Sequence, residues 1–451
     1  MGVVPVPGRA QRERAGGMKI AVVGSGIAGL SSALWLSRRH EVTVFEAGDH
    51  LGGHTHTVRV DLPDETHDVD TGFIVYNDTN YPLFSSLLGQ LGVATQPSEM
   101  SFSVSGARGD VEYRRDVEYR GNGLGLWARP ASALDPSHSR LLADILQFNR
   151  DARRFLAAGA VTGIPPSTTE TLADFLSRGR YGPRLAPHYL VPLGSAIWSA
   201  DPTTFDAVPV GMLFRFLENH GMLQLKGRPR WRTVTGGAAR YVEAIVDRTP
   251  ARFRRATPVE KLTRTAAGVT VMSAAGPEDF DAAVVAVHSD QALGLLSDPS
   301  PDERRVLGAI GYRPNVAVLH TDASLLPRRR RAWASWNAHL PVEPVDRPTV
   351  TYWMNRLQRL DSRHQICVTL NREQHVDPAT VLGRWVYHHP VFDAAAVAAQ
   401  ARRRDVQGHR RTWYCGAYWG YGFHEDGVAS AVDVCRDLGV DPVSDLGAPI
   451  R

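Results

Sequence analysis

Short apolar runs and a helical pattern alternate near the start of the chain. The first run is Ile20-Ala21-Val22-Val23, and the second is Val42-Thr43-Val44-Phe45. Between them, the stretch Leu30 to Leu36 has the composition of a helix. Short apolar runs bounded by turn residues are typical of buried strands. The pattern therefore predicts a strand, a helix and a second strand.

The middle of the chain has a different pattern, and strands return after residue 232. Runs such as 141–148 and 175–176 predict helices, which Pro183, Pro187 and Pro192 interrupt. A further helix is expected to begin near Tyr241. Three strand-like runs follow at 258–262, 269–272 and 281–287, and the last is a buried-strand pattern bounded by His288. The order of elements predicts an α/β fold with discontinuous domains.

A glycine-rich turn joins the first predicted strand to the first predicted helix. In Gly24-Ser25-Gly26-Ile27-Ala28-Gly29, the first glycine permits the turn and the second lets a pyrophosphate approach the backbone. The third glycine lets the helix lie close to the strand, and the helix N-terminus offers N–H groups to phosphates. Glu46 ends the second strand, where an acid can accept hydrogen bonds from a ribose. The segment predicts a dinucleotide site.

The chain from Val22 to Thr57 resembles the fingerprint of the flavin amine oxidase, phytoene desaturase and protoporphyrinogen oxidase superfamily. The resemblance rests on the glycine turn, Glu46 and a second glycine pair, Gly52-Gly53. In that superfamily the second pair lets the backbone wrap the pyrophosphate and ribityl chain, so the resemblance implies that the dinucleotide is FAD. The sequence departs from the family at His54, where arginine is usual. Imidazole can donate a hydrogen bond but lacks the bidentate fork of arginine.

Later segments resemble the same superfamily in the same order. Val259 matches the residue that offers its backbone to adenine, and 414–417 with 422–431 match the last strand and a helix that faces the flavin. The dipole of such a helix can stabilise negative charge on the flavin. The cofactor-binding residues that the resemblance implies are Gly24, Ser25, Gly26, Ile27, Ala28, Gly29, Glu46, Ala47, Gly52, Gly53, His54, Thr57, Val259, Gly416, Gly427 and Val428.

The resemblance implies a Rossmann-type FAD-binding domain interleaved with an α+β substrate domain. We expect the FAD-binding domain in residues 18–85, 232–290 and 405–445, and the substrate domain in residues 86–231 and 291–404. Residues 1–17 are expected to form a flexible tail. A length of 451 residues suits two domains.

Composition and charge exclude several classes of protein. Hydrophobic content of 43% and charged content of 22% are typical of a soluble globular protein, and no apolar run is long enough to span a membrane. The net charge of +4 is small, and no basic and aromatic groove predicts nucleic-acid binding. Arg328 to Arg331 form one dense basic run, which suits a solvated loop better than peripheral contact with an anionic membrane.

Cysteines and histidines add two expectations. Cys367, Cys415 and Cys435 show no paired spacing, so we expect reduced thiols in the cytoplasm. Cys415 does not lie at the usual flavin tether of the family, so we expect FAD to be bound non-covalently. Histidines and aspartates between residues 50 and 70 lie inside the cofactor-wrapping segment and lack a ligand pattern, so no metal site is expected.

The lysines bear on the chemistry. Many amine oxidases of the superfamily use a lysine in the substrate-facing sheet to hold a water against flavin N5, and desaturase relatives lack it. The only lysines here are Lys19, Lys226 and Lys261, and none falls at that place in chain order. The resemblance therefore favours dehydrogenation of a lipophilic substrate, such as a fatty-acyl or isoprenoid chain, by hydride transfer to the flavin. Two alternatives stay open, an amine oxidase and a nucleotide-binding protein without redox activity.

Aromatic residues near the C-terminal glycine strand are the candidates for the substrate pocket. Tyr418, Trp419 and Tyr421 lie between that strand and the helix expected to face the flavin. The sequence identifies no catalytic residue and does not define the substrate, the electron acceptor or the oligomeric state.

Overall fold

The structure is a computed structural model of the 451-residue chain. It describes residues 17–106, 118–120, 134–162, 170–198, 205–224, 227–340 and 349–442. The tail expected at residues 1–17 therefore lies almost entirely outside the described residues. Within the described ranges, no helix combines the length and apolar character that crossing a membrane requires.

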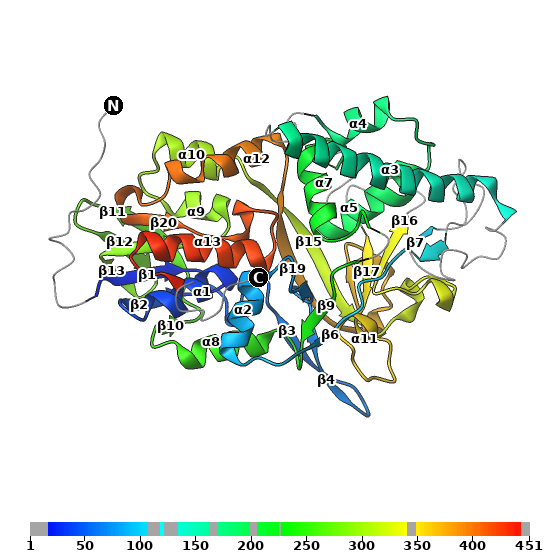
Figure 1. The fold of residues 1–451 in the computed structure, drawn as a ribbon. Coiled ribbons are helices and arrows are strands. Elements are labelled where there is room, and N and C mark those ends of the chain that lie inside the picture. The colour runs from blue at the N-terminus through cyan, green and yellow to red at the C-terminus, as the bar shows by residue number, and fades with distance from the viewer. Residues whose placement is uncertain are drawn as a thin grey trace.

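A five-stranded sheet forms the first half of the molecule (Figure 1). Its strand order is β10-β2-β1-β14-β20, and the recorded pairs are all parallel. The strands are β1 (Lys19–Val23), β2 (Glu41–Phe45), β10 (Arg252–Arg254), β14 (Ala282–Val285) and β20 (Thr412–Tyr414). Each of them comes from one of the three segments expected to form the FAD-binding domain. The predicted strands at 20–23 and 42–45 are confirmed as β1 and β2.

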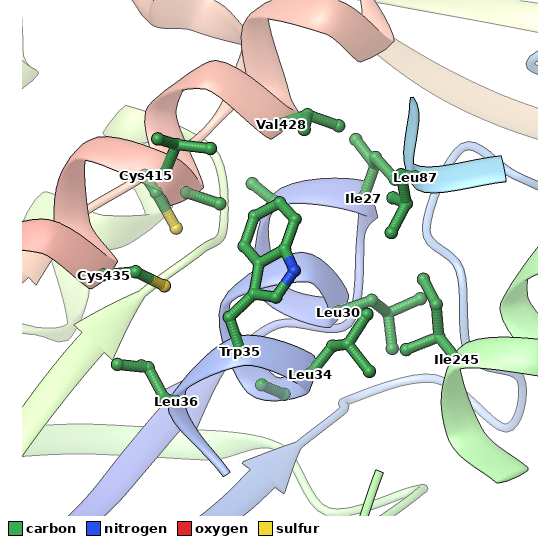
Figure 2. Close-up of a cluster of buried hydrophobic side chains, with 14 of the residues drawn as sticks. Ile27, Leu30, Leu34, Trp35, Leu36, Leu87, Ile245, Cys415, Val428 and Cys435 are labelled. Atoms are coloured by element: carbon green, nitrogen blue, oxygen red, sulfur yellow. The ribbon is translucent and has the colours of Figure 1, made fainter. Parts of the chain in front are cut away.

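Alternate residues of β1 face two different layers, as both faces of a parallel sheet are covered. Ile20 and Val22 face a core shared with helices α1 (Ile27–Leu36), α2 (Pro82–Leu91), α8 (Ala239–Arg248) and α13 (His424–Asp437). Trp35 of α1 is fully buried at the centre of this core (Figure 2). All ten residues of α1 are buried, which explains its nearly continuous apolar sequence.

The second layer lies on the other face of the sheet. Ala21 and Val23 contact α9 (Ser289–Leu295), α10 (Pro301–Leu307), α12 (Ala394–Ala401) and a three-stranded sheet. That sheet contains β11 (Val259–Arg264), β12 (Val269–Ser273) and β13 (Gly276–Phe280).

The predicted domain boundaries differ from this packing at helices α2, α9, α10 and α12. Helices α10 and α12 fall in the expected substrate domain, yet they pack on the nucleotide-side sheet because Val306 and Ala396 supply its second core. The boundary at residue 85 falls inside α2, whose apolar face packs as one unit in the first core. Sequence spacing alone does not reveal which sheet an amphipathic helix will cover.

A seven-stranded sheet dominates the second half of the molecule, with the order β19-β15-β18-β17-β16-β7-β8. The long strands β15 (Gly311–His320) and β19 (Val381–Val391) form its edge nearest the first half (Figure 1). The others are β7 (Phe102–Gly106), β8 (Glu118–Arg120), β16 (Trp336–Leu340), β17 (Val350–Trp353) and β18 (Cys367–Leu370). These strands come from segments 86–231 and 291–404, which we expect to form the substrate domain.

Helices cover one side of this sheet, and small sheets join the two halves. The helices are α3 (Pro136–Thr162), α4 (Leu172–Arg178), α5 (Val191–Trp198) and α7 (Val210–Asn219), and their shared core includes Phe148 and Phe214.

Two small sheets complete the described fold. The first is the hairpin of β3 (Thr57–Asp61) and β4 (Thr66–Asp70). The second has the order β5-β9-β6 and contains β5 (Tyr76–Asn77), β6 (Thr95–Pro97) and β9 (Trp231–Val234). The α/β architecture predicted from the sequence is confirmed.

Candidate dinucleotide site

The first glycine loop has the three properties that its sequence predicts. Gly24 has a φ of +100°, and a Cβ there would lie 2.8 Å from the carbonyl oxygen of Ala286. A Cβ on Gly29 would lie 2.0 Å from the carbonyl oxygen of Gly24, so only glycine lets α1 approach the turn this closely. A Cβ on Gly26 would meet no atom within 4 Å. The open space above Gly26 is where a pyrophosphate needs to approach the backbone.

The second glycine pair lies directly against the first loop. Gly52 donates its N–H to the carbonyl oxygen of Ser25 at 3.0 Å. Gly53 has a φ of +59°, and a Cβ there would be 3.1 Å from the Cα of Gly26. Two stretches of bare backbone therefore meet in front of the N-terminus of α1, which is a geometry suited to a phosphate group.

Glu46 lies at the end of β2, beside the same loop. Its Oε2 accepts hydrogen bonds from the backbone N–H and hydroxyl of Ser25, at 3.0 Å and 2.5 Å. Its Oε1 accepts from the N–H of Gly48 at 2.8 Å. The half-buried carboxylate is thereby held next to the phosphate end of the turn, where the ribose hydroxyls of a dinucleotide are recognised.

Val259 lies at the adenine end that the resemblance implies. The preceding segment runs beside Glu46, because Thr257 and Ala256 donate N–H bonds to the carbonyl oxygens of Glu46 and Gly48, at 2.8 Å and 2.7 Å. Val259 begins β11 immediately afterwards, and its side chain is partly buried. Ala47 is exposed beside this segment.

The N-terminus of α13 meets the N-terminus of α1. A Cβ on Gly427 would stand 2.7 Å from Cγ2 of Ile27, and Ala28 is the next closest neighbour. Val428 is fully buried in the core between the helices (Figure 2). Gly416 precedes α13 and donates its N–H to the hydroxyl of Ser430 at 2.9 Å. Two helix dipoles therefore direct partial positive charge toward one region.

His424, the first residue of α13, lies in a buried polar group that the sequence did not reveal. Its Nε2 is 2.9 Å from the hydroxyl of Tyr241 and 3.0 Å from that of Thr55. Its ring stacks on Phe73 with centroids 3.5 Å apart. Burial lowers the pKa of His424 to about 3, so the ring is neutral near physiological pH.

The carboxylates that follow His424 are also perturbed. Glu425 accepts N–H bonds from Leu83 and Phe84 at 3.0 Å and 2.9 Å, and burial raises its pKa to about 7. Asp426 accepts from the N–H groups of Tyr421 and Phe423, and burial raises its pKa to about 6. These bonds fix the first turn of α13 against α2 and against the loop before it.

Three aromatic rings lie near His54, the residue that follows the second glycine pair. Its ring centroid lies 5.2 Å from that of Tyr387, 5.5 Å from that of His389 and 5.8 Å from that of His288. Burial, followed by the neighbouring histidines, holds the pKa of His54 well below its ordinary value. His288 and His389 were not expected here, and the only sequence signal was the position of His288 directly after a predicted buried strand.

The hydroxyl of Thr57 forms two hydrogen bonds within the protein. It donates to Asp70 Oδ1 at 2.6 Å and accepts from the N–H of Ala239 at 2.8 Å. The same Asp70 oxygen accepts from the N–H of Ala238, and burial raises the Asp70 pKa to about 7. Thr57 thus links β3 to the start of α8, and its role in cofactor binding stays a prediction.

The three pocket candidates lie in different surroundings. Tyr418 is buried in the second core of the nucleotide-side sheet, and Trp419 packs against that core with its Nε1–H bonded to the carbonyl oxygen of Tyr414. Tyr421 instead lines a cavity of about 860 Å³, together with His220 and Phe423. Neither Tyr418 nor Trp419 lines that cavity, because the short turn Ala417–Trp419 directs Tyr418 inward.

The described residues contain one group with metal-ligand spacing, outside the histidines first considered. Donor atoms of Asp64, Glu65 and His364 lie within 4.8 Å of one another. Ser362 and the N–H of Arg363 already bond to Glu65, and His364 lies 2.9 Å from Asp64. These contacts join the β3–β4 hairpin to the loop at 362–364.

Cys415 is a buried residue of the first core. Its thiol is fully buried between α1 and α13, 3.7 Å from the hydroxyl of Ser32 and near Cys435 (Figure 2). Burial raises the pKa of Cys415 to about 11, which keeps the thiol protonated and poorly nucleophilic. Non-covalent attachment of FAD stays a prediction.

Two glycine loops, a ribose-side carboxylate and two converging helix N-termini define a dinucleotide-binding protein with a Rossmann-type half. The chain belongs to the flavin containing amine oxidoreductase family, which residues 27–323 match. The family confirms FAD as the expected cofactor. The residues fit that group, since the bare backbone at Gly26 leaves the room that a diphosphate requires.

The chain matches curated relatives over part of their length. The protein named flavin-containing monoamine oxidase AofH, from Mycobacterium tuberculosis, is 25% identical over 294 residues, which cover 62% of this chain and 59% of that protein. Carotenoid phi-ring synthase of Streptomyces griseus is 29% identical over 344 residues, which cover 72% of this chain and 62% of that protein. The chain thus spans about six tenths of the length of these relatives.

Similarity to solved structures extends over nearly the whole fold. The CLA-producing fatty acid isomerase from P. acnes superimposes with a TM-score of 0.66 at 16% identity, covering 94% of this chain and 99% of that one. At this identity the likeness shows a shared fold.

Proposed function

We propose that the protein is an FAD-dependent oxidoreductase that dehydrogenates a lipophilic substrate, such as a fatty-acyl or isoprenoid chain. When bound, FAD supplies the hydride acceptor, and the protein supplies binding, orientation and exclusion of water. The observation that carries the proposal is the distribution of lysines. In the described part of the seven-stranded sheet no strand contains a lysine, so none of these strands supplies the residue that amine oxidases of the superfamily use beside flavin N5.

The described lysines lie elsewhere. Lys19 is on β1 and forms an ion pair with Glu278 at 3.0 Å. Lys261 is exposed on β11, beyond the adenine end of the site. Lys226 lies outside the described residues, so its distance from the flavin stays untested.

The relatives support the proposal in part. Carotenoid phi-ring synthase and the fatty acid isomerase are both named for lipophilic molecules. Their names favour chemistry on hydrocarbon chains, and the superfamily includes enzymes that abstract hydride from carbon. The identity of the substrate belongs to the proposal.

A second candidate function, amine oxidation, has one observation in its favour. The cavity of about 860 Å³ is lined by aromatic rings together with the carboxylates of Asp78, Glu218, Glu425 and Asp426. Carboxylates beside aromatic rings suit a cationic ligand. The relative AofH is named as a monoamine oxidase. Against this candidate, Glu425 and Asp426 are already bonded to backbone N–H groups.

Anaerobic reduction of the FAD-loaded protein separates the candidates. We expect unsaturated acyl or isoprenoid compounds to bleach the visible absorbance of the flavin, and primary and secondary amines to leave it unchanged. Rapid bleaching by an amine would replace the proposal with amine oxidation. If dithionite reduces the flavin while neither class of compound does, the protein is better described as a nucleotide-binding protein without this redox activity.

Replacement of Lys226 tests the lysine argument directly. Lys226→Met should leave the rate of flavin reduction within a few-fold of the parent, as should the matched Lys261→Met. Removing a group that positions the reactive water would instead slow the reaction by about 10²- to 10⁴-fold. A loss of that size in Lys226→Met alone would contradict the proposal. Action in the cytoplasm belongs to the same proposal, and Arg328 to Arg331 are expected to form a solvated loop rather than a membrane contact.

A further inference from the structure

Four histidines from three separate segments meet beside the glycine loops. We call them the histidine cluster: His54, His288, His388 and His389. His54 follows Gly53, His288 is the N-cap of α9, and the other two lie near the end of β19. The His54 centroid is 5.8 Å from that of His288 and 5.5 Å from that of His389, and the centroids of His288 and His388 are 6.4 Å apart.

The histidine cluster borders the phosphate end of the dinucleotide site. A Cβ on Gly53 would touch the Cα of Gly26, and His54 is the next residue. On the opposite side, the carbonyl oxygen of Ala286 faces Gly24, and His288 comes two residues later. Two members of the cluster, His54 and His288, therefore follow segments that contact the first glycine loop. That loop is the one whose exposed backbone suits a diphosphate.

The cluster contains no carboxylate of its own. In the described part of the chain, the only hydrogen bond recorded for its rings joins Nδ1 of His389 to the amide nitrogen of Asn315 at 2.9 Å. Burial lowers the pKa of His288, and the charge of Asp290 on α9, which acts to raise this pKa, is the smaller effect. Burial and the neighbouring imidazoles lower the pKa of His389 to about 4.

Other titratable groups surround the cluster, and two of them, Asp49 and Asp70, are acids that act on His56 and Tyr387 rather than on the cluster rings. On β15, Tyr312 stacks on His288 with centroids 4.4 Å apart and bonds to the N–H of Ser289. On β19, Tyr387 bonds to Thr71 and to His56. The remaining neighbours that act on these groups are His424 on α13, Asp70 at the end of β4, and His50 and Asp49 before the second glycine pair.

We propose that the histidine cluster is an anion subsite for the FAD diphosphate, and that the imidazoles of His54, His288 and His389 take up protons as the nucleotide binds. Without an anion, these half-buried imidazoles, which repel one another, are most stable when neutral. A diphosphate dianion nearby favours the protonated form and moves the imidazole pKa upward. Between the free and bound pKa values, binding takes up protons, so the affinity for FAD rises as the pH falls.

The test is the pH dependence of FAD affinity in the deflavinated full-length protein. FAD is titrated from about pH 5 to about pH 8, a range that begins below the ordinary imidazole pKa because the pKa values of the free cluster are lowered, and the dissociation constant is read from quenching of flavin fluorescence. We expect the Kd to increase by up to about tenfold per pH unit for each proton taken up. Riboflavin, which lacks phosphate, should bind with little pH dependence over the same range. Calorimetry in two buffers of different ionisation enthalpy should show proton uptake with FAD and none with riboflavin.

Neutral variants assign the effect to the cluster. His54→Gln and His389→Gln should flatten the FAD profile while keeping riboflavin affinity and the melting temperature at about pH 8. His409→Gln, at an exposed histidine before β20, should keep the parent slope. The proposal is overturned if the parent Kd for FAD is independent of pH, if riboflavin shows the same slope, or if both cluster variants retain it. None of these outcomes depends on the oxidised substrate, so the proposed function is tested separately.

Discussion

Gly427 of α13 lies against Ile27 of α1 so closely that a Cβ on the glycine would stand 2.7 Å from Cγ2 of the isoleucine. The contact joins the first residue of one helix to the first turn of another, although 400 positions separate them in the sequence. Because both helices begin at this contact, any increase in side-chain volume there moves two dipoles away from the cofactor site.

Gly427→Ala should weaken FAD binding and destabilise the protein. Overpacking of a tight contact costs about 1–3 kcal/mol, so we expect a lower melting temperature and reduced flavin content after purification. Gly89→Ala in α2 is the matched control, since a Cβ there meets no atom within 4 Å and alanine favours a helix. Unchanged flavin content in Gly427→Ala would show that the helices can separate without loss of the site.

Glu46→Ala should purify with little flavin and melt earlier unless FAD is added. Each charge-assisted hydrogen bond to the ribose is worth about 1.5–3 kcal/mol, which corresponds to roughly a ten- to hundredfold loss of affinity. Glu41→Ala provides the comparison, because Glu41 lies at the opposite end of β2 and pairs only loosely with Arg252 at 3.7 Å. Equal flavin occupancy in Glu46→Ala and the parent would remove Glu46 from the site.

Acid precipitation should release FAD from the protein into the supernatant. The Cys415 thiol is buried between two helices and held protonated, so we expect no thioether at this position. Cys415→Ala should release its flavin in the same way as the parent. Colour that stays with the pellet of the parent and leaves the pellet of Cys415→Ala would prove a covalent link.

The flavin-free protein should be most stable near neutral pH and should melt earlier at about pH 5. Burial lowers the pKa of each of these histidines to about 4 or about 3 in the folded state: His220, His320, His339, His389 and His424. Their contribution to stability is present above the unfolded pKa of about 6.5 and is lost as the pH falls below it.

Buried carboxyls act in the opposite direction in the same pH range. Asp70 and Glu425 have folded pKa values raised to about 7, so their contribution is present at low pH and lost as the pH rises toward 7. The histidines outnumber these groups, and the net effect below pH 6.5 is destabilising. His320→Asn, in the seven-stranded sheet, should reduce the slope of stability against pH by about 1.4 kcal/mol per pH unit. Thermal melts at several pH values measure the slope, and an unchanged slope would contradict the assignment.

Local patterns predicted the nucleotide half well. The glycine turn, Glu46 and the strands at 20–23 and 42–45 depend on residues close in sequence, and their backbone requirements are specific. Gly29 is a good example, because the close approach of helix to turn excludes any side chain at that position. The apolar pattern also predicted the later strands at 258–262, 269–272 and 281–287, which correspond to β11, β12 and β14.

The histidine cluster could not be predicted, for a physical reason. His54, His288 and His389 are separated by more than 100 residues at each step, and the long strand β19 brings the last of them to the glycine loops. Nothing in the local sequence of β19 indicates which of its side chains will face the other half. Tyr418 and Trp419 illustrate a second limit, because a single short turn decided that Tyr418 points into the core while Tyr421 lines a cavity.

Strand β20 is an edge strand of the sheet that contains β1, and α13 provides the second of the two helix N-termini at the site, after that of α1. During synthesis the N-terminal segments leave the ribosome first, and contacts between distant segments form last. A nascent chain therefore carries a glycine loop with one helix dipole until residues 424–437, which form α13, have been synthesised. The stabilisation that FAD can give by binding the native state is therefore expected only once α13 has been made and has folded against α1.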